Sequence, residues 1–286
     1  MKKNKKRNFI VLGIVIVLVA CIAIMLFQVK GEKKEVVETD QNSYRYIKVD
    51  GKDYRYRTNL KTILFLGIDT TDETKNQGQS DAIDLAIFDR DQQKIKIVSL
   101  SRDTMCKIRL FDSEGNDLGW DKQHLGLAYS YGKNRKHGGI LAKDAVSKLL
   151  SDIPLVNYTA FDLNSLQELQ DIIGDMPMVL DDDYIDINPL WKKGKKIVIN
   201  RDNVEEFVRS RNTSKDYSNK TRMQRQKLYI QTNINQLKTQ LTNDYSTTLQ
   251  KMYNFYSKLT TNITLKEIDS YAEMILNYSI DNNEYY

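Results

Sequence analysis

Hydrophobic residues follow two different spacings along the chain from residue 61 onward. Short apolar or alternating runs predict β-strands at residues 62–67, 82–88, 94–100 and 155–161. Apolar side chains three or four residues apart predict amphipathic helices over residues 141–150 and 163–173. Asp162 and Gly174 are suitable boundary residues for the second helix. The polar segment 89–93 joins two of the strands as a hairpin loop.

The C-terminal part of the chain is predominantly helical in pattern. A long helix is predicted to open near Arg222, and helix continues beyond Leu241. The last helix begins with a capping box, Thr264-Leu265-Lys266-Glu267. Strands that alternate with helices after an initial hairpin are typical of a layered α/β protein. We therefore predict one αβα domain with a mixed central sheet over residues 60–286.

The N-terminal pattern is different. Residues 9–27 carry no charge and are almost all aliphatic. Because a helix needs about 20 such residues to cross the hydrocarbon core, we predict one transmembrane helix at residues 9–29. The basic tail 1–8 is then cytoplasmic by the positive-inside rule, and the rest of the chain lies outside the cell membrane. Residues 30–59 are polar and form a predicted extracellular spacer with one short strand near Tyr44–Val49.

Two other interpretations of the apolar segment are a cleaved signal peptide and a lipoprotein signal. Leu18-Val19-Ala20-Cys21 has the small-residue-then-cysteine form of a lipid attachment site. The apolar run continues past Cys21 to Phe27, however, and no small-residue cleavage site follows, which favours a membrane span. Cys106 is then the only extracellular cysteine, so an intramolecular disulfide is excluded.

Composition and charge narrow the classes of protein. The 286 residues are 41% hydrophobic and 28% charged, which excludes a collagen-like or fully disordered chain. The net charge of +5 is matched by the five basic residues of the tail, Lys2, Lys3, Lys5, Lys6 and Arg7. The predicted domain therefore lacks the overall positive charge of a nucleic-acid-binding protein, and we expect no nucleic-acid partner.

Two carboxylates lie near the start of the predicted sheet. Asp69 follows the strand 62–67, at the strand end where ligands bind in open α/β sheets. Asp81 precedes the next strand, and adjacent strands would bring the two carboxylates together. Mg²⁺ is commonly held by one or two carboxylates with water and phosphate, so the pair is a candidate metal site. The alternative is that both are polar residues of a solvated loop.

Arginines form a second group of candidate residues. Arg102-Asp103 follows the third strand, either as part of a site or as a surface ion pair. Arg209 and Arg211 come shortly before the long helix. Guanidinium groups bind phosphate oxygens bidentately, so several of them directed at one point would form a diphosphate site.

The long helix carries further polar candidates. Arg222, Arg225 and Gln226 share one face with Tyr229. We expect a neighbouring apolar face to pack on the core, with the arginines at its margin: Met223, Ile230, Ile234, Leu237 and Leu241. A solvated helix face is the alternative to a ligand site.

Seven short segments together resemble, in order, the motifs of the LytR-CpsA-Psr family. The resemblance runs from about Asn59 to about Leu276, behind the expected membrane anchor. The segments are Ile63-Leu64-Phe65-Leu66-Gly67-Ile68-Asp69, Gln79-Ser80-Asp81, Val98-Ser99-Leu100-Ser101-Arg102-Asp103-Thr104, Ala128-Tyr129-Ser130-Tyr131-Gly132, Val208-Arg209-Ser210-Arg211, Arg222-Met223-Gln224-Arg225-Gln226 and Thr261-Asn262-Ile263-Thr264.

The resemblance implies a phosphotransferase that acts outside the membrane of mainly Gram-positive bacteria. Such an enzyme moves a glycopolymer, for example a teichoic acid or a capsular polysaccharide, from a polyprenyl-diphosphate carrier to peptidoglycan. It implies that Asp69 and Asp81 hold Mg²⁺, with Mn²⁺ as the other candidate ion. Arg102 and Asp103 are the implied catalytic residues, Asp103 as a general base. The implied diphosphate-binding residues are Arg102, Arg209, Arg211, Arg222 and Gln226. The apolar helix faces would leave a tunnel for the polyprenyl chain.

Several positions depart from the family pattern. Ser101 stands where a Pro usually precedes the Arg, and His124 and Gly126 stand where Lys and Asn are common. His124 is thus a candidate diphosphate contact in place of a lysine. Asp84 stands in a segment that is usually small or Thr-rich, and is a competing metal ligand. Two other functions remain: a polyprenyl-diphosphate hydrolase, and a carrier-binding protein without transfer activity. The predicted span and the balanced charge argue against a regulator of transcription.

Overall fold

The computed structural model describes residues 46–55, 57–70, 78–214 and 219–281. The chain divides into two compact units, residues 1–56 and 57–286. In the first unit, β1 (Tyr46–Val49) and β2 (Lys52–Arg55) form an antiparallel hairpin. The short strand expected near Tyr44–Val49 is confirmed over residues 46–49, and its partner β2 is an addition to the prediction.

The basic tail 1–8 and the predicted transmembrane helix 9–29 lie outside the described residues. Within the part of the chain that the structure describes, no helix is both long enough and apolar enough to cross a membrane.

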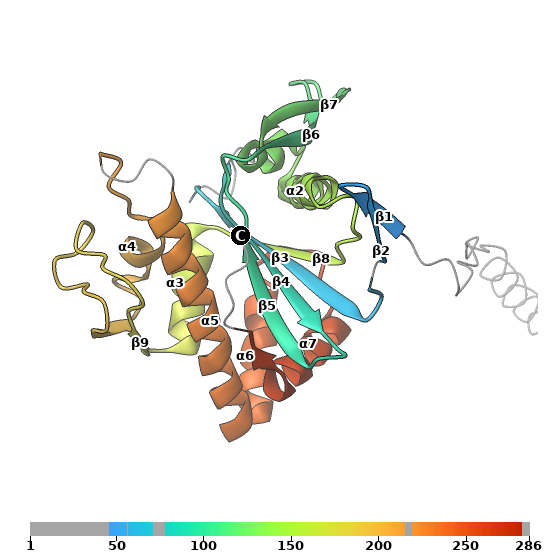
Figure 1. Ribbon diagram of the computed structural model, residues 1–286. Helices are drawn as coiled ribbons and strands as arrows, with labels where there is room; N and C mark the ends of the chain where they lie inside the picture. The colour runs from blue at the N-terminus through green and yellow to red at the C-terminus, as the bar shows by residue number, and fades with distance from the viewer. Residues whose placement is uncertain (1–45, 56, 71–77, 215–218, 282–286) are drawn as a thin grey trace, which may run out of the picture. The chain divides into compact units, whose positions relative to one another are not determined.

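The second unit is built on a mixed six-stranded sheet with the strand order β11-β8-β3-β4-β5-β12 (Figure 1). β3 pairs antiparallel with β4 and parallel with β8, whereas β12 pairs parallel with β5. The mixed sheet and its early hairpin, β4–β5, agree with the sequence prediction. The strands are β3 (Leu60–Ile68), β4 (Ser80–Asp89), β5 (Lys94–Ser99), β8 (Asn157–Phe161), β11 (Thr260–Thr261) and β12 (Ser279–Ile280).

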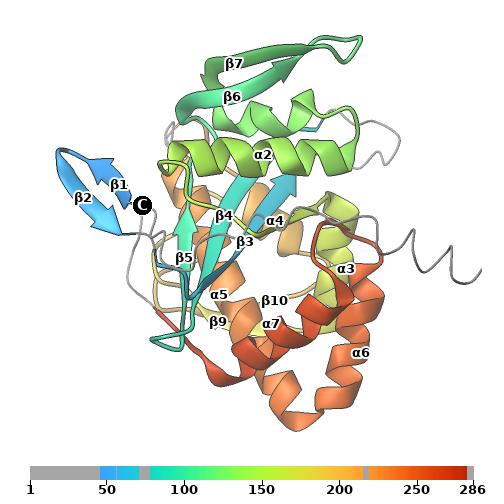
Figure 2. The same ribbon diagram turned by 90° about the vertical axis from the view of Figure 1, so that its right-hand side faces the viewer.

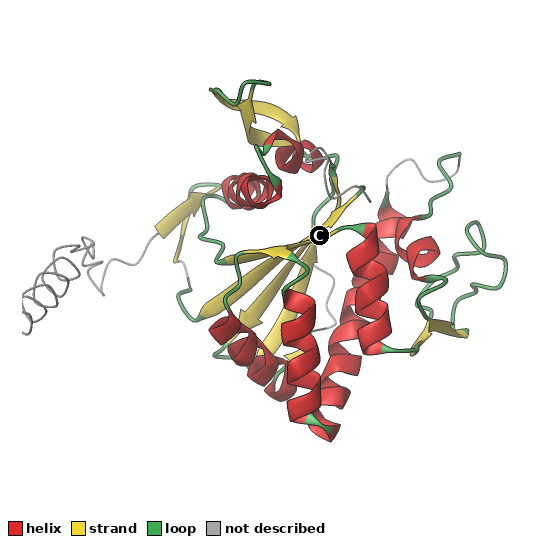
Figure 3. Cartoon of the chain, turned by 180° about the vertical axis from the view of Figure 1, so that it is seen from behind, coloured by secondary structure: helices red, strands yellow, loops and turns green. Residues whose placement is uncertain are grey.

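Helices cover both faces of this sheet (Figures 2 and 3). One face packs on α2 (Arg135–Leu149) and the 3₁₀-helix η1 (Leu125–Tyr131), with Leu64 and Leu85 in the shared core. The other face packs on the remaining long helices, with Ile63 and Ile97 in that core. These are α3 (Leu163–Ile173), α5 (Lys220–Asn243), α6 (Tyr245–Tyr256) and α7 (Leu265–Asn277). Since successive strand side chains point to opposite faces, a strand buried on both faces needs two cores.

The helix boundaries follow the local signals. Asp162 accepts a hydrogen bond from the Ser165 amide at the start of α3, and Gly174 ends the helix with a φ of 78°. Thr264 and Glu267 form the capping box of α7. These contacts satisfy amide groups that a helix terminus leaves without partners.

Two further hairpins and one short helix were absent from the prediction. β6 (Met105–Phe111) pairs antiparallel with β7 (Asp117–His124), and β6 contacts α2. β9 (Met176–Val179) pairs antiparallel with β10 (Lys196–Ile199), which leads into α4 (Val204–Arg209).

We expect the substitution Gly139→Ala to destabilise the protein. A Cβ atom at this position of α2 would overlap the ring of Tyr158, which is 1% exposed and donates a hydrogen bond to the Lys136 carbonyl at 2.9 Å. Overpacking of this kind typically costs about 1–3 kcal/mol. Urea denaturation measures the loss, with Lys136→Ala as an exposed control on the same helix, expected within about 0.5 kcal/mol of wild type. Equal stability of the Gly139→Ala variant would contradict this packing.

Candidate functional site

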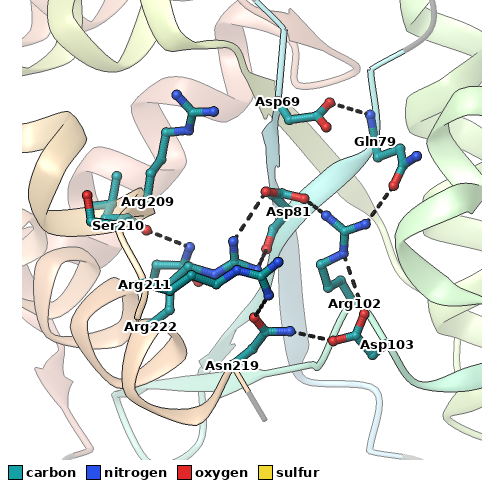
Figure 4. A network of polar contacts seen from close by, with 12 residues as sticks. Asp69, Gln79, Asp81, Arg102, Asp103, Arg209, Ser210, Arg211, Asn219 and Arg222 are labelled. Atoms are coloured by element: carbon teal, nitrogen blue, oxygen red, sulfur yellow. Dashed lines mark hydrogen bonds and ion pairs between the residues drawn. The ribbon is translucent and has the colours of Figure 1, made fainter. Parts of the chain in front are cut away.

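A cluster of charged side chains lies where several chain segments meet at one end of the sheet (Figure 4). Asp69 directly follows β3, Asp81 lies at the beginning of β4, and Arg102 and Asp103 follow β5. Arg211 comes from the segment after α4, and Arg222 from the first turn of α5. The structure therefore brings together most of the residues that the sequence motifs singled out.

Asp81 is the centre of this cluster. Its carboxylate forms ion pairs with Arg102 and with Arg222, whose Nη1 lies 3.2 Å from Oδ2. Arg102 also donates from Nη2 to the side-chain oxygen of Gln79 at 2.6 Å. The backbone N–H of Gln79 donates to Asp69 Oδ1 at 2.6 Å. Asp81 and Arg102 are each 24% exposed at the side chain, so both remain accessible to a ligand.

Asn219 joins the two halves of the cluster. Its side chain accepts a hydrogen bond from Arg211 and donates one to the carboxylate of Asp103. It is 2% exposed and has a φ of 59°, in the left-handed region that Asn tolerates better than most residues. Sequence reasoning missed this residue, and the only available signal was an Asn immediately before a helix.

The arginine cluster, which we define as Arg102, Arg211 and Arg222, is electrostatically strained. Burial, together with the positive charges of Arg211 and Arg102, lowers the pKa of Arg222 to about 10. Arg222 remains protonated at neutral pH, but its charge is less favourable than that of an exposed arginine. An anion with several oxygen atoms would relieve this repulsion and accept hydrogen bonds from the guanidinium groups.

The other predicted diphosphate ligands lie around the cluster. Arg209 is 40% exposed at the side chain and forms an ion pair with Glu205 at 2.5 Å. Gln226 is buried and donates from Nε2 to the Val208 carbonyl at 3.0 Å. His124 is exposed at the end of β7, with Nδ1 3.1 Å from the Asp103 carbonyl oxygen.

The prediction for α5 is confirmed only in part: Leu241 is buried in the core and Ile230, Ile234 and Leu237 pack against it, but the polar face is not at the margin of the buried surface. Its polar face is the more deeply buried: Arg225 is 0% exposed, donates to the carbonyls of Phe207 and Ser210, and lies 5.3 Å from the Tyr184 ring centroid. Arg225 thus satisfies carbonyl groups at the C-terminal end of α4, which have no partner within that helix. Ile230, Ile234 and Leu237, which were expected in the core, are only partly buried.

These partly buried residues line a pocket between the sheet and helices α3 and α5. The cavity measures about 260 Å³, and its walls include Phe161, Leu166, Leu169, Ile230, Ile234 and Leu237. Asp69, Asp81 and Arg209 also line it, and we call these three residues the pocket mouth. The pocket is therefore apolar along its length and charged beside the arginine cluster.

Asp84 is an ionisable group within the pocket wall. It is 3% exposed, accepts a hydrogen bond from Ser99 Oγ at 2.6 Å, and lines the same cavity. Burial raises its pKa to about 6, although the Ser99 hydrogen bond and the positive charge of Lys227 act in the opposite direction.

The carboxylates at the pocket mouth would hold a metal ion only together with oxygen atoms of a bound phosphate or of water. Among the described residues there is no group of three or more Asp, Glu, His or Cys side chains that could hold a metal. Asp69 and Asp81 line the same pocket mouth, and two carboxylates completed by phosphate and water oxygens are a usual environment for Mg²⁺. Asp81 is engaged by two arginines, so an ion would compete with them.

The fold and the site define an α/β protein with a cationic cluster at the end of an apolar pocket. The LytR_cpsA_psr family model matches residues 23–284, and the chain belongs to this family. The family expected from the sequence motifs is thus confirmed.

Similar proteins include a relative from Enterococcus faecalis named polyisoprenyl-teichoic acid–peptidoglycan teichoic acid transferase TagU. It is 31% identical over 179 residues, which cover 61% of this chain and 53% of the relative. The chain spans about half the length of the curated relatives it matches.

Two solved structures share the fold. The crystal structure of B. subtilis TagV has a TM-score of 0.61 and 19% identity, covering 79% of this chain and 84% of TagV. The family protein YwtF (TagT) with bound octaprenyl pyrophosphate lipid has a TM-score of 0.53 and 20% identity, covering 78% of this chain and 76% of that protein.

The raised pKa of Asp84 predicts a specific pH dependence of stability. Between about pH 4 and 6 the folded state holds a proton that the unfolded state has released, so ionisation of Asp84 destabilises the protein as the pH rises. Relative to an Asp84→Asn variant, wild type should lose about 3 kcal/mol of unfolding free energy between pH 3.5 and 7.5. Chemical denaturation at both pH values measures the difference. The exposed control Asp175→Asn should follow wild type, and parallel profiles for Asp84→Asn would refute the assignment.

Proposed function

We propose that this protein is a membrane-anchored extracellular phosphotransferase. It moves a glycopolymer, a teichoic acid or a capsular polysaccharide, from a polyprenyl-diphosphate carrier to peptidoglycan. The observation that carries the proposal is the position of the arginine cluster beside the mouth of an apolar pocket. A diphosphate attached to a long hydrocarbon chain has the same division between charged and apolar parts. The names of TagU and of lipid-bound TagT support this substrate class.

The pocket would hold the apolar end of the carrier. Burial of hydrocarbon against Ile230, Ile234 and Leu237 would contribute about 25 cal/mol per Å² of apolar surface removed from water. The diphosphate would then lie at the pocket mouth, within reach of the arginine cluster. In the free protein, the carboxylate of Asp81 neutralises Arg102 and Arg222. The negative charge of the diphosphate would take over part of this neutralisation.

Mg²⁺, or Mn²⁺ in its place, is the proposed cofactor, with Asp69 and Asp81 as its protein ligands. When bound, the ion supplies positive charge that neutralises phosphoryl oxygens during transfer. Asp81 would then need less support from its two arginines, which leaves guanidinium groups for the phosphate oxygens. Asp69 has one carboxylate oxygen engaged by the Gln79 amide, and its second oxygen is the proposed ligand.

The proposed reaction is an in-line displacement. A hydroxyl of a peptidoglycan sugar attacks the phosphorus that bears the glycopolymer, and the bond between that phosphorus and the bridging oxygen of the diphosphate breaks. The leaving group is the polyprenyl monophosphate. Asp103, 50% exposed at the side chain, is the proposed acceptor of the hydroxyl proton, and Arg102 Nε lies 3.7 Å from its carboxylate. The arginine cluster stabilises the charge on the transferred group.

The proposed location follows from the predicted transmembrane helix at residues 9–29. A cytoplasmic tail at 1–8 would leave residues 57–286 outside the membrane, where both the lipid carrier and peptidoglycan are accessible.

A hydrolase that cleaves the polyprenyl-diphosphate carrier is the second candidate function. It is supported by the half-exposed carboxylate of Asp103, because water can reach this position and take the place of the sugar hydroxyl. The two functions share the carrier site and differ in the acceptor.

We expect Arg102→Ala and Asp81→Asn to abolish transfer. The full chain in detergent is incubated with a polyprenyl-diphosphate glycan and a peptidoglycan oligomer, with and without Mg²⁺. Each variant should lose at least about 100-fold in rate, the usual effect of removing a charged group that stabilises the transition state. Arg201→Ala, which removes an exposed ion pair with Asp171, is the matched control and should remain active. Full activity of Arg102→Ala would refute the site, and lipid monophosphate without a glycan product would identify a hydrolase.

A bulky side chain inside the pocket should raise KM for carriers with a long prenyl chain more than for short ones. Ile234→Trp places a bulky ring in the cavity, so we expect KM to rise about tenfold or more for an octaprenyl carrier and little for a short-chain analogue. Asn235→Trp, on the exposed side of α5, is the control and should keep the wild-type KM. A uniform change for both carrier lengths would indicate a general effect on folding, and would argue against the pocket as the lipid site.

A further inference from the structure

The outward face of the β6–β7 hairpin has a composition that folding does not require. Opposite residues of an antiparallel pair share a face, and the register pairs Met105 with His124, Lys107 with Lys122, and Arg109 with Trp120. On the opposite face, Cys106 and Ile108 are buried in the core that includes residues of α2 and η1. Figure 2 shows the hairpin beside α2. We define the hairpin strip as the exposed residues Met105, Lys107, Trp120, Lys122 and His124; Arg109 on the same face is also exposed but already forms an ion pair with Asp117.

Two features of the hairpin strip oppose stability. Lys107 and Lys122 are directly opposite each other, and like charges in this position destabilise a strand pair. Neither lysine has an ion-pair partner among the described residues. Trp120 is 40% exposed and Met105 is 47% exposed, although burial of such side chains is favourable. Lys148 of α2 lies 5.8 Å from the Trp120 ring centroid and helps to hold the ring in place. A ligand with carboxylates and an apolar surface would satisfy all of these groups.

The hairpin strip begins at the proposed active site. His124 Nδ1 lies 3.1 Å from the carbonyl oxygen of Asp103, and the strand then runs four residues to Trp120, about 13 Å at the usual rise per residue. This length suits a short segment of a polysaccharide chain.

The hairpin and the apolar pocket lie on opposite sides of the central sheet. The hairpin packs with α2, whereas the pocket lies between the sheet and helices α3 and α5. In an in-line displacement the nucleophile approaches from the side opposite to the leaving group. If the lipid phosphate leaves towards the pocket, the attacking hydroxyl comes from the side of the hairpin.

We propose that the hairpin strip binds the acceptor, a peptidoglycan strand. Sugar rings pack on Trp120 and Met105, and carboxylates of the strand and its peptides pair with Lys107 and Lys122. This inference rests on the proposed transferase function and adds the surface that positions the second substrate. The glycopolymer of the donor is also anionic. It is a substituent of the attacked phosphorus, however, and is neither the nucleophile nor the leaving group, so the direction of attack does not place it on the hairpin strip.

Binding measurements on the full chain in detergent test the proposal without depending on catalysis. The probes are a soluble uncrosslinked peptidoglycan oligomer, a glycerol-phosphate polymer and octaprenyl diphosphate. Lys122→Glu and Trp120→Ala should each weaken binding of the peptidoglycan oligomer at least tenfold and leave octaprenyl diphosphate binding unchanged. Lys193→Glu, an exposed lysine between β9 and β10 with the same change of charge, is the control and should bind all probes like wild type.

Stability separates a binding role from a structural one. Lys122→Glu replaces a like-charge pair with an opposite-charge pair, so its Tm should equal or exceed that of wild type while its affinity for peptidoglycan falls. A lower Tm with a proportional loss of binding for every probe would overturn the proposal, because it would indicate a structural role.

Other results would also overturn it. One is wild-type affinity for the peptidoglycan oligomer in both variants, or no binding by wild type. Another is a selective loss of the glycerol-phosphate polymer, which would assign the surface to the donor. A failed transfer reaction combined with variant-sensitive peptidoglycan binding would refute the transferase function and leave the hairpin strip as an acceptor-binding surface.

Discussion

The carboxylate of Asp81 holds together arginines that would otherwise repel one another. Arg102 and Arg222 come from parts of the chain that are 120 residues apart by number, and both contact this one group. Arg222 is 5% exposed at the side chain, so its charge has lost most of its hydration and needs a counter-charge. The junction of β4, β5 and α5 therefore depends on a negative charge at this point. In the proposed function, the anionic substrate shares that role with Asp81.

Hydrogen bonds between α5 and the end of α4 keep the segments that carry the arginines in position. Arg225 and Gln226 of α5 donate hydrogen bonds to carbonyl groups at the end of α4. These bonds, together with the burial of Val204 and Phe207 in the core, fix the segment that carries Arg209 and Arg211. Asn219 completes the arrangement by joining Arg211 to Asp103. The arginines of one motif thus have different partners: Arg222 pairs with the carboxylate of Asp81, and Arg225 donates to backbone carbonyls.

The central sheet separates two different environments. On the side of α3 and α5 it forms one wall of the apolar pocket, and on the side of α2 it supports the hairpin strip. The arginine cluster lies at the end of the sheet, where both sides are accessible. In the proposed function, a lipid-linked donor and a polysaccharide acceptor would meet at this point without sharing a binding surface.

The sequence alone determined the central elements and most of the charged cluster. Strands β3, β4, β5 and β8, both boundaries of α3 and the start of α7 were predictable, because hydrophobic period and capping are local properties of the chain. Asp69, Asp81, Arg102, Arg211 and Arg222 were identified from short motifs. β6 and β7 were missed, because their outward side chains are lysine, tryptophan and other residues that serve no core.

Only the tertiary structure decided that the polar face of α5 is buried together with its apolar face. Helical periodicity separates two faces but does not say which one meets the rest of the protein, and carbonyl groups of a distant segment make burial of Arg225 favourable. The tertiary structure also decided that Ile230 and Ile234 line a pocket. The shape of a pocket depends on how separate helices pack, and the spacing of hydrophobic residues along one helix does not encode it. The role of Asn219 and the burial of Asp84 have the same origin, because each depends on partners that only folding brings into contact.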